Sequence, residues 1–331
     1  MSFSFKKGRK IAIVKGGKYD GKFLRIFDKK SVSGPCCGKC SDDCKDGDIK
    51  KCCSKCKGGC MVNDITNNIE HVNKYIKKFK KDNGKNMTTS QLNAMEKVLF
   101  ECVKFVEEQN DDMDEFKLTD GILVPLLDED DTQLDRGVVF GVSGSGKSYL
   151  VGKMLEEFKK LNPKKDIVIF SNVMEDEALD VLKPIRIPLD MNLVTDPISD
   201  EELSNTVVVF DDIDTEKNKK VRDTVVGIRD HLCEVGRHTK TYVVNTMHQL
   251  NFTRKETRIV LNEATFLIFF PKSGSVRPIV NYFKNIVGID SKEIKRLVRL
   301  PSRWVQINRK YPQCVLYDTG AISLYNLMNT D

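Results

Sequence analysis

Residues 137–154, GVVFGVSGSGKSYLVGKM, carry a glycine-rich octapeptide between two segments of different periodicity. Before it, residues 138–140 form a β-prone apolar run, which predicts the end of a buried strand. After it, apolar residues recur at helical spacing, which predicts a helix that packs one face on a sheet. A chain that passes from a strand through a glycine turn into such a helix is restricted to folds in which helices cover a sheet.

The octapeptide, residues 141–148, matches G-x-x-x-x-G-K-[ST], the P-loop pattern that binds nucleoside triphosphates. Its glycines let backbone N–H groups point at phosphate oxygens, and the helix N-terminus adds a positive dipole end. Lys147 can then reach the β- and γ-phosphates, and the Ser148 hydroxyl can ligate Mg²⁺. We therefore expect ATP and Mg²⁺ as ligands. The expected nucleotide-binding residues are Gly141, Val142, Ser143, Gly144, Ser145, Gly146, Lys147, Ser148 and Tyr149.

Further strands are predicted after the P-loop, with helical patterns between most of them. They cover residues 165–171, 205–214, 240–249 and 264–271, and a β-meander is predicted at residues 303–325. Alternating strands and helices indicate a doubly wound α/β fold with a mostly parallel sheet. In such folds ligands bind at the carboxyl ends of the strands.

Two acids end the strand predicted at residues 205–214. Asp211 is placed to hold Mg²⁺, directly or through water, as a Walker B acid. Asp212 follows and could orient or deprotonate the attacking water. The alternative is a turn that merely begins with acids. The sequence contains no LSGGQ-like signature, so an ABC transporter is set aside. It also lacks the guanine-reading N-K-x-D motif, so ATP is favoured over GTP.

Polar residues also flank the strand predicted at residues 240–249. Arg237 and His238 stand before it, and His248 and Gln249 stand at its end. An arginine at the edge of such a sheet can reach the γ-phosphate held by a neighbouring subunit. A glutamine at the other end could sense that phosphate or its water. An ordinary surface arginine and a strand-end amide are the alternatives.

The combination of GVSGSGKS, VVVFDD, GRH before a strand and HQ after it resembles the FtsK–HerA superfamily. More narrowly, it resembles the genome-packaging ATPases of large nucleocytoplasmic DNA viruses, and the closing LPSRWVQINRKYPQCVLYD is similar to the tail of that group. The resemblance covers about residues 118–331. It implies a ring of identical subunits that uses ATP to move double-stranded DNA into a capsid. It also implies capsid or virion proteins as partners, and a location in the host cytoplasm, at a viral factory, or in the virion.

The resemblance also assigns roles to individual residues. It implies that Lys147 and Ser148 bind phosphate and Mg²⁺, and that Asp211 is the Walker B acid. It further implies that Arg237 is an arginine finger acting in trans and that Gln249 is the sensor. Two positions depart from the family pattern: Asp212 stands where many relatives have Glu, and the sensor position can align one or two residues before Gln249.

The charge of the chain is unevenly distributed. Residues 1–60 hold 16 Lys and Arg against 6 Asp and Glu, and residues 241–331 hold 13 against 6. Basic ends around an acidic middle suit a polyanionic partner. The N-terminus lacks the apolar core of a signal peptide, so export is not expected, and no apolar run approaches the ~18 residues that span a bilayer.

The N-terminal third lies outside the resemblance. Residues 1–33 predict a small basic β-hairpin that resembles a KOW motif, with a plain basic hairpin as the alternative. Residues 62–117 read as a helical hairpin followed by an acidic linker, and residues 118–331 as the ATPase domain. No motif of the expected active site lies in the first 60 residues.

Residues 34–61 hold a tandem cysteine repeat, C-C-x2-C-x3-C twice. The expected tetrahedral Zn²⁺ ligands are Cys37, Cys40, Cys53 and Cys56, and a second ion or a shared cluster could use Cys36, Cys44, Cys52 and Cys60. Zinc is favoured in a reducing compartment, and disulfides or free thiols are the alternatives. The scattered Cys102, Cys233 and Cys314 are expected to be packing residues.

Two classes of function remain open from the sequence. The first is a DNA-translocating packaging ATPase. The second is a P-loop protein that is not a motor, either a nucleoside kinase or a nucleotide-gated scaffold bound to nucleic acid. A kinase would need an arginine-rich lid, and KNKKVRD, the best candidate segment, fits that role poorly. ATPase activity that responds to duplex DNA would separate the two classes.

Overall fold

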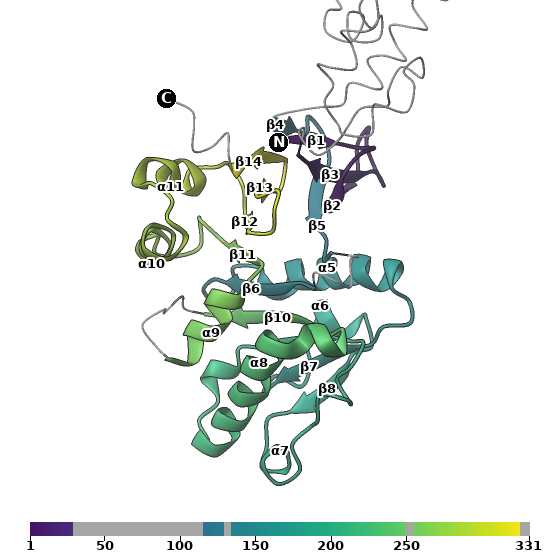
Figure 1. The fold of residues 1–331 in the computed structure, drawn as a ribbon, viewed down its shortest axis with the longest axis vertical. Helices are drawn as coiled ribbons and strands as arrows, with labels where there is room; N and C mark the ends of the chain where they lie inside the picture. Colours follow the sequence, from purple (N-terminus) through teal and green to yellow (C-terminus); the bar gives the residue numbers. More distant parts are fainter. Residues whose placement is uncertain (29–114, 129–133, 249, 251–254, 325–331) are drawn as a thin grey trace, which may run out of the picture. The chain divides into compact units, whose positions relative to one another are not determined.

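The computed structural model describes residues 1–28, 115–128, 134–248, 250 and 255–324 (Figure 1). The chain divides into two compact units, Met1–Phe27 with Met113–Asp331 and Asp28–Asp112, and only the first is described below. The cysteine repeat and the predicted helical hairpin lie outside the described residues, as does Gln249. Their predictions therefore stay predictions.

A ten-stranded sheet forms the centre of the described unit, in the order β4-β14-β13-β12-β11-β6-β10-β9-β7-β8. Its parallel part consists of β6 (Arg136–Phe140), β7 (Ile167–Ser171), β8 (Ile185–Pro188), β9 (Val207–Asp211), β10 (Tyr242–Met247) and β11 (Phe266–Phe269). Its antiparallel part consists of β4 (Glu115–Lys117), β12 (Val305–Asn308), β13 (Cys314–Tyr317) and β14 (Gly320–Ser323). The predicted α/β fold with a mostly parallel sheet and a terminal β-meander is confirmed.

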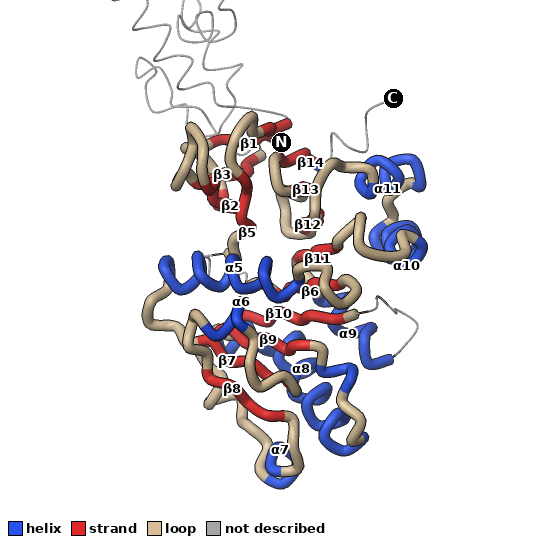
Figure 2. Tube along the Cα trace, turned by 180° about the vertical axis from the view of Figure 1, so that it is seen from behind, coloured by secondary structure: helices blue, strands red, loops and turns tan. Residues whose placement is uncertain are grey.

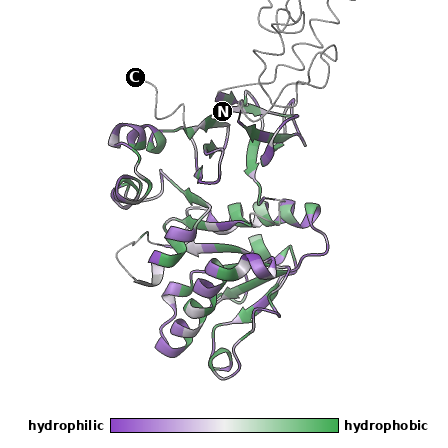
Figure 3. Ribbon diagram, in the orientation of Figure 1, coloured by the Kyte–Doolittle hydropathy of each residue, from purple (hydrophilic) through white to green (hydrophobic). Residues whose placement is uncertain are grey.

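Helices cover both faces of this sheet, which is why its central strands are apolar on both sides. One core cluster packs α8 (Lys219–Thr239), α9 (Lys255–Glu263), α10 (Arg277–Tyr282) and α11 (Ser291–Val298) against the sheet. The other packs α5 (Lys147–Leu161) and α6 (Glu177–Asp180). The short α7 (Asn192–Thr195), a 3₁₀ turn at Ile213–Thr215 and a π-helical turn at Phe283–Val287 complete the helices described. Figure 2 shows the strands between the helices, and Figure 3 shows hydrophobic segments on many of the strands.

Alternation along the central strands explains the two core clusters. In β9, Val208 and Phe210 face the cluster of α8, whereas Val207 and Val209 face the cluster of α5. All four side chains are fully buried. The two cysteines in the described residues outside the repeat, Cys233 and Cys314, are also buried in these clusters, as packing residues should be. A strand buried on both faces is held firmly, so the residue that follows it has a fixed position.

A second sheet of four strands has the order β1-β3-β2-β5. It consists of β1 (Ser2–Ser4), β2 (Arg9–Lys15), β3 (Phe23–Phe27) and β5 (Ile122–Pro125). The antiparallel β2–β3 pair is the hairpin that the sequence predicts, with a bulge between Lys10 and Ala12. The pairing of β2 with β5 was not predicted from the sequence. It joins the N-terminal hairpin to a strand from residues 118–331, which were assigned to the ATPase domain.

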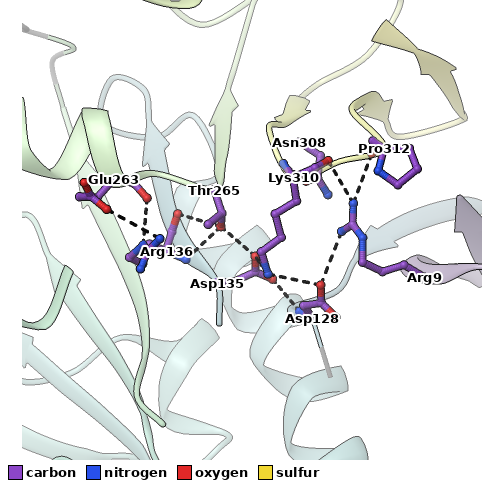
Figure 4. A network of polar contacts seen from close by, with 9 residues as sticks. All are labelled: Arg9, Asp128, Asp135, Arg136, Glu263, Thr265, Asn308, Lys310 and Pro312. Carbon is purple, nitrogen blue, oxygen red and sulfur yellow. Dashed lines mark hydrogen bonds and ion pairs between the residues drawn. The ribbon is translucent and has the colours of Figure 1, made fainter. Parts of the chain in front are cut away.

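A buried network of charges joins the two sheets (Figure 4). Lys310 Nζ lies 3.3 Å from Asp128 Oδ2 and 2.8 Å from Asp135 Oδ1, and all three side chains are almost fully buried. Arg9 of β2 lies 3.7 Å from the same Asp128 oxygen and donates to the carbonyl of Pro312. Removing one partner from such a buried set costs about 3–5 kcal/mol, because it leaves a charge uncompensated. The network therefore fixes the start of β6 relative to β2 and the β12–β13 turn.

Candidate active site

The register of three parallel strands assembles the site. Phe140 of β6 lies opposite Met247 of β10, and Thr246 of β10 lies opposite Asp211 of β9. The N–H of Gly141 continues this ladder by donating to the carbonyl of Met247, at 3.1 Å. The P-loop and the ends of β9 and β10 therefore meet at one edge of the sheet, as a doubly wound fold predicts.

The P-loop has the backbone that its glycines allow. Gly144 and Gly146 have φ values of 74° and 102°, a region that L side chains rarely adopt. Gly146 is the residue before α5, and its carbonyl accepts the first helical hydrogen bond from Leu150, at 3.0 Å. The N-terminus of a fifteen-residue helix thus opens into the loop, which is the geometry that binds phosphate.

Lys147 connects the loop to the two neighbouring strand ends. Its ammonium group donates to the carbonyl of Gly141 at 2.9 Å. It also lies 3.4 Å from His248 Nδ1 and 3.8 Å from Asp212 Oδ2. Although the side chain is only 8% exposed, this cation has both a carbonyl and a carboxylate beside it. These partners hold the ammonium group at the loop, where phosphate is expected to bind.

Asp211 is buried and held by two hydroxyl groups. Thr246 Oγ1 donates to Asp211 Oδ1 at 2.6 Å, and Ser171 Oγ donates to Asp211 Oδ2 at 3.1 Å. Thr246 Oγ1 also accepts a hydrogen bond from the N–H of Asp212, at 3.1 Å. Neither Ser171 nor Thr246 was predicted from the sequence. The signal that could have found them is a hydroxyl residue at or near the end of a buried strand.

Asp212 has an unusual backbone and an unusual carboxylate. Its φ of 48° is left-handed, which costs a non-glycine residue energy and often marks a functional position. Burial raises the pKa of Asp212 above its ordinary value, while Lys147 and His248 oppose the rise. Within the described residues Oδ1 is buried without a hydrogen-bond partner. A carboxylate with a raised pKa and an unused oxygen is suited to accept a proton from water.

His248 joins the site through both ring nitrogens. Nε2 lies 3.0 Å from Asp212 Oδ2, and Nδ1 faces Lys147. The sequence places His248 at a strand end without giving it a role, since the contact with Asp212 depends on the register of β10 against β9. His248 therefore orients the carboxylate of Asp212 and stabilises its charged form.

Arg237 lies apart from these residues. It is an exposed residue in the last turn of α8, before the start of β10, whereas the P-loop follows the end of β6. Since β6 and β10 are parallel, Arg237 and the P-loop of the same chain lie at opposite ends of the strands. Gln249 lies outside the described residues. The structure thus brings Lys147, Asp211 and Asp212 together, and it leaves Arg237 free to face another molecule.

The residues present suit a nucleotide with its Mg²⁺. Ser145 Oγ and Asp212 Oδ1 are buried polar atoms without partners in the described part of the chain. In that part, three or more His, Cys, Asp or Glu side chains nowhere gather as a metal site. Mg²⁺ typically takes one or two protein ligands, with water and phosphate oxygens for the rest. Ser148 and Asp211 fit that requirement.

Comparisons with known proteins give a viral relative. No model of a known protein family matches the sequence. Uncharacterized protein V3 of the Sputnik virophage is 37% identical over 221 residues, which cover 66% of this chain and 88% of that protein. Within the described residues, no helix is both long and apolar enough to cross a membrane.

Similar solved structures include two proteins in complex with nucleotide analogues. The genome packaging NTPase B204 of Sulfolobus turreted icosahedral virus 2 is 14% identical, with 56% of this chain and 97% of that chain covered and a TM-score of 0.39. The conjugation coupling protein TcpA of pCW3 is 13% identical, with 62% and 66% covered and a TM-score of 0.42.

With Asp212 as the general base, ATP turnover should fall as the pH is lowered, because a base acts only when it is deprotonated. The inflection should lie above 3.8, the ordinary value, since burial raises the pKa of Asp212. His248 lowers that pKa, so His248→Asn should move the inflection to higher pH. The measurement is a pH–rate profile of each protein. His231→Asn changes a histidine that contacts Asp200 instead and should leave the inflection in place. An unchanged inflection in His248→Asn would remove Asp212 as the base.

Proposed function

The chain belongs to the same family as protein V3 of the Sputnik virophage, and on that premise we propose that it is an ATP-hydrolysing DNA translocase. Its task would be to package a viral genome by moving double-stranded DNA into a capsid. The observation that carries the hydrolytic part is the convergence of Lys147, Asp211 and Asp212 at the carboxyl ends of β6 and β9. The viral relative supports the context, and capsid or virion proteins and a place in the host cytoplasm or the virion belong to the same proposal.

Each residue of the site has a role in the proposed hydrolysis. Lys147 would neutralise charge on the β- and γ-phosphates. Ser148 and Asp211 would hold Mg²⁺, which when bound supplies further positive charge to the triphosphate. Asp212 would take the proton of the attacking water, with His248 holding its carboxylate at 3.0 Å. Gln249 is proposed as the sensor of the γ-phosphate.

Arg237 is proposed to complete the site of a neighbouring copy. Its distance along the strands from its own P-loop supports this role, because an arginine finger must reach the γ-phosphate. A ring of identical subunits gives every site such a partner. In that arrangement the Arg237 of each subunit would contact the γ-phosphate at the P-loop of its neighbour.

Arg237→Ala should keep nucleotide binding and lower turnover by ~10³ or more, as expected for the loss of a finger. Mixing Arg237→Ala with Lys147→Ala should restore part of the ATPase activity, because some interfaces then combine an intact P-loop with an intact arginine. Each variant alone, at the same total concentration, is the control. If no mixing ratio restores activity, Arg237 is an ordinary surface residue.

A basic groove on α11 supports contact with DNA. Ile294 and Leu297 of this helix are fully buried, and the basic side chains project from it into solvent. A groove of about 550 Å³ is lined by Lys292, Lys295, Arg296, Arg299, Leu300 and Pro301. A translocase must contact phosphates rather than base edges, because such contacts do not depend on sequence. Arg254, Lys255 and Arg258 follow β10 and are further candidates for contact with DNA; of these, only Arg258 has a described side chain, and it is exposed.

Duplex DNA of any sequence should raise the ATPase activity, and the effect should weaken steeply with salt. Replacing Lys292, Lys295 and Arg299 with Ala should lower the stimulation and reduce the salt slope by about one per lost phosphate contact. Turnover without DNA should not change. The matched control replaces Lys217, Lys219 and Lys220, which are also exposed, and removes the same charge. An ATPase rate that does not change with DNA would favour a scaffold, and a rate that depends on a small acceptor would favour a kinase.

A further inference from the structure

Two cavities border the P-loop at different points. The first, of about 500 Å³, reaches Ser145 and Gly146 at the end of the loop. The second, of about 410 Å³, reaches Gly141 and Val142 at the start of the loop and is also lined by His248. Each has the size of an ordinary small-molecule site.

The chemistry around the loop distinguishes the two cavities. His248 lines the second cavity and contacts Asp212, the proposed base, so we expect the γ-phosphate and its attacking water on that side of the loop. If the γ-phosphate lies near the second cavity, a triphosphate that follows the loop places its nucleoside at the first cavity. The first cavity is mostly apolar there, with a lining that includes Ile122, Tyr149, Leu150, Phe270, Arg303 and Trp304.

We propose that the first cavity binds the purine base and ribose of ATP; this rests on the proposed function. Tyr149 and Ile122 are large apolar side chains that line the cavity and are 58% and 47% exposed, so a bound base would find exposed apolar surface there. Aromatic side chains stack on bases of any kind, so Tyr149 supplies affinity for the nucleoside.

Polar groups of the cavity can fix the orientation of the nucleoside. Asp318 accepts a hydrogen bond from the N–H of Arg303 through Oδ2, at 3.2 Å, while its buried Oδ1 has no partner in the described residues. That oxygen can accept a hydrogen bond from a ribose hydroxyl or a base amino group. Arg303 Nη2 would lie 3.6 Å from a Cβ atom added to Gly146, so the guanidinium lies beside the end of the loop. It is placed to contact the ribose or the adjacent phosphate.

The small N-terminal sheet forms one wall of this cavity. Residues 122–124 of β5 and Lys15 of β2 line it, and Lys15 Nζ lies 2.8 Å from Glu157 of α5. All these elements belong to one compact unit. Nucleoside binding at this cavity would therefore connect the P-loop helix to the N-terminal strands, which the sequence alone gave no reason to place near ATP.

Trp304 provides a direct readout, because it is the single tryptophan of the chain and lines the cavity. We expect ATP to change the tryptophan fluorescence of the full-length protein, and inorganic tripolyphosphate to compete with ATP without causing that change. Ile122→Glu places a charge where the base would lie and should weaken ATP binding about tenfold or more, while tripolyphosphate affinity stays the same. Because Ile122 is half exposed, the substitution should leave the fold intact.

Ile185→Glu is the matched control, since Ile185 is a strand residue with 52% exposure on β8 and does not line the cavity. It should leave ATP affinity unchanged. Equal affinities for ATP and tripolyphosphate, with no effect of Ile122→Glu, would overturn the cavity assignment and leave the P-loop site standing. Failure of both ligands to bind would overturn the proposed function itself.

Discussion

The register of β9 against β10 is the constraint on which the site depends. It places Thr246 opposite Asp211, so that one hydroxyl donates to the Asp211 carboxylate and accepts from the N–H of Asp212. A slip of one residue would turn every side chain of β10 to the other face of the sheet. Both strands are buried on two faces, and such strands resist slipping. The pairing of the strands therefore sets the positions of Asp211 and Asp212 beside Lys147.

A buried network of charges lies at the opposite end of β6. Lys310 lies between Asp128 and Asp135 at the start of β6, and Arg9 brings the small sheet into the same network. One strand thus carries the buried network at its start and the P-loop at its end. This arrangement gives the N-terminal strands a structural reason to affect the nucleotide site, although no motif of the expected active site lies in the first 60 residues.

Local patterns predicted the parts of the site that depend on neighbouring residues in the sequence. The P-loop, its helix and Asp211 could be predicted because each is marked by glycine spacing, helical periodicity or an acid after a buried run. Contacts that depend on register or on distant segments could not. Ser171 and His248 come from strands far apart in the sequence, and Arg303 approaches Gly146 across more than one hundred and fifty residues. The position of Arg237 in the last turn of α8 was not predicted, because the sequence placed this residue only before the strand at residues 240–249.

The central claim is that Lys147 and the acids at the ends of the strands form one site that hydrolyses ATP. The most direct measurement is the steady-state ATPase rate of Lys147→Ala, with Lys164→Ala as the control because Lys164 is an exposed lysine just beyond α5. Folding of both variants is checked by urea unfolding. The account predicts that Lys147→Ala loses activity by ~10² or more, since it removes a cation that stabilises transition-state charge, while Lys164→Ala keeps it. Turnover near the wild-type rate in a folded Lys147→Ala protein would contradict the account.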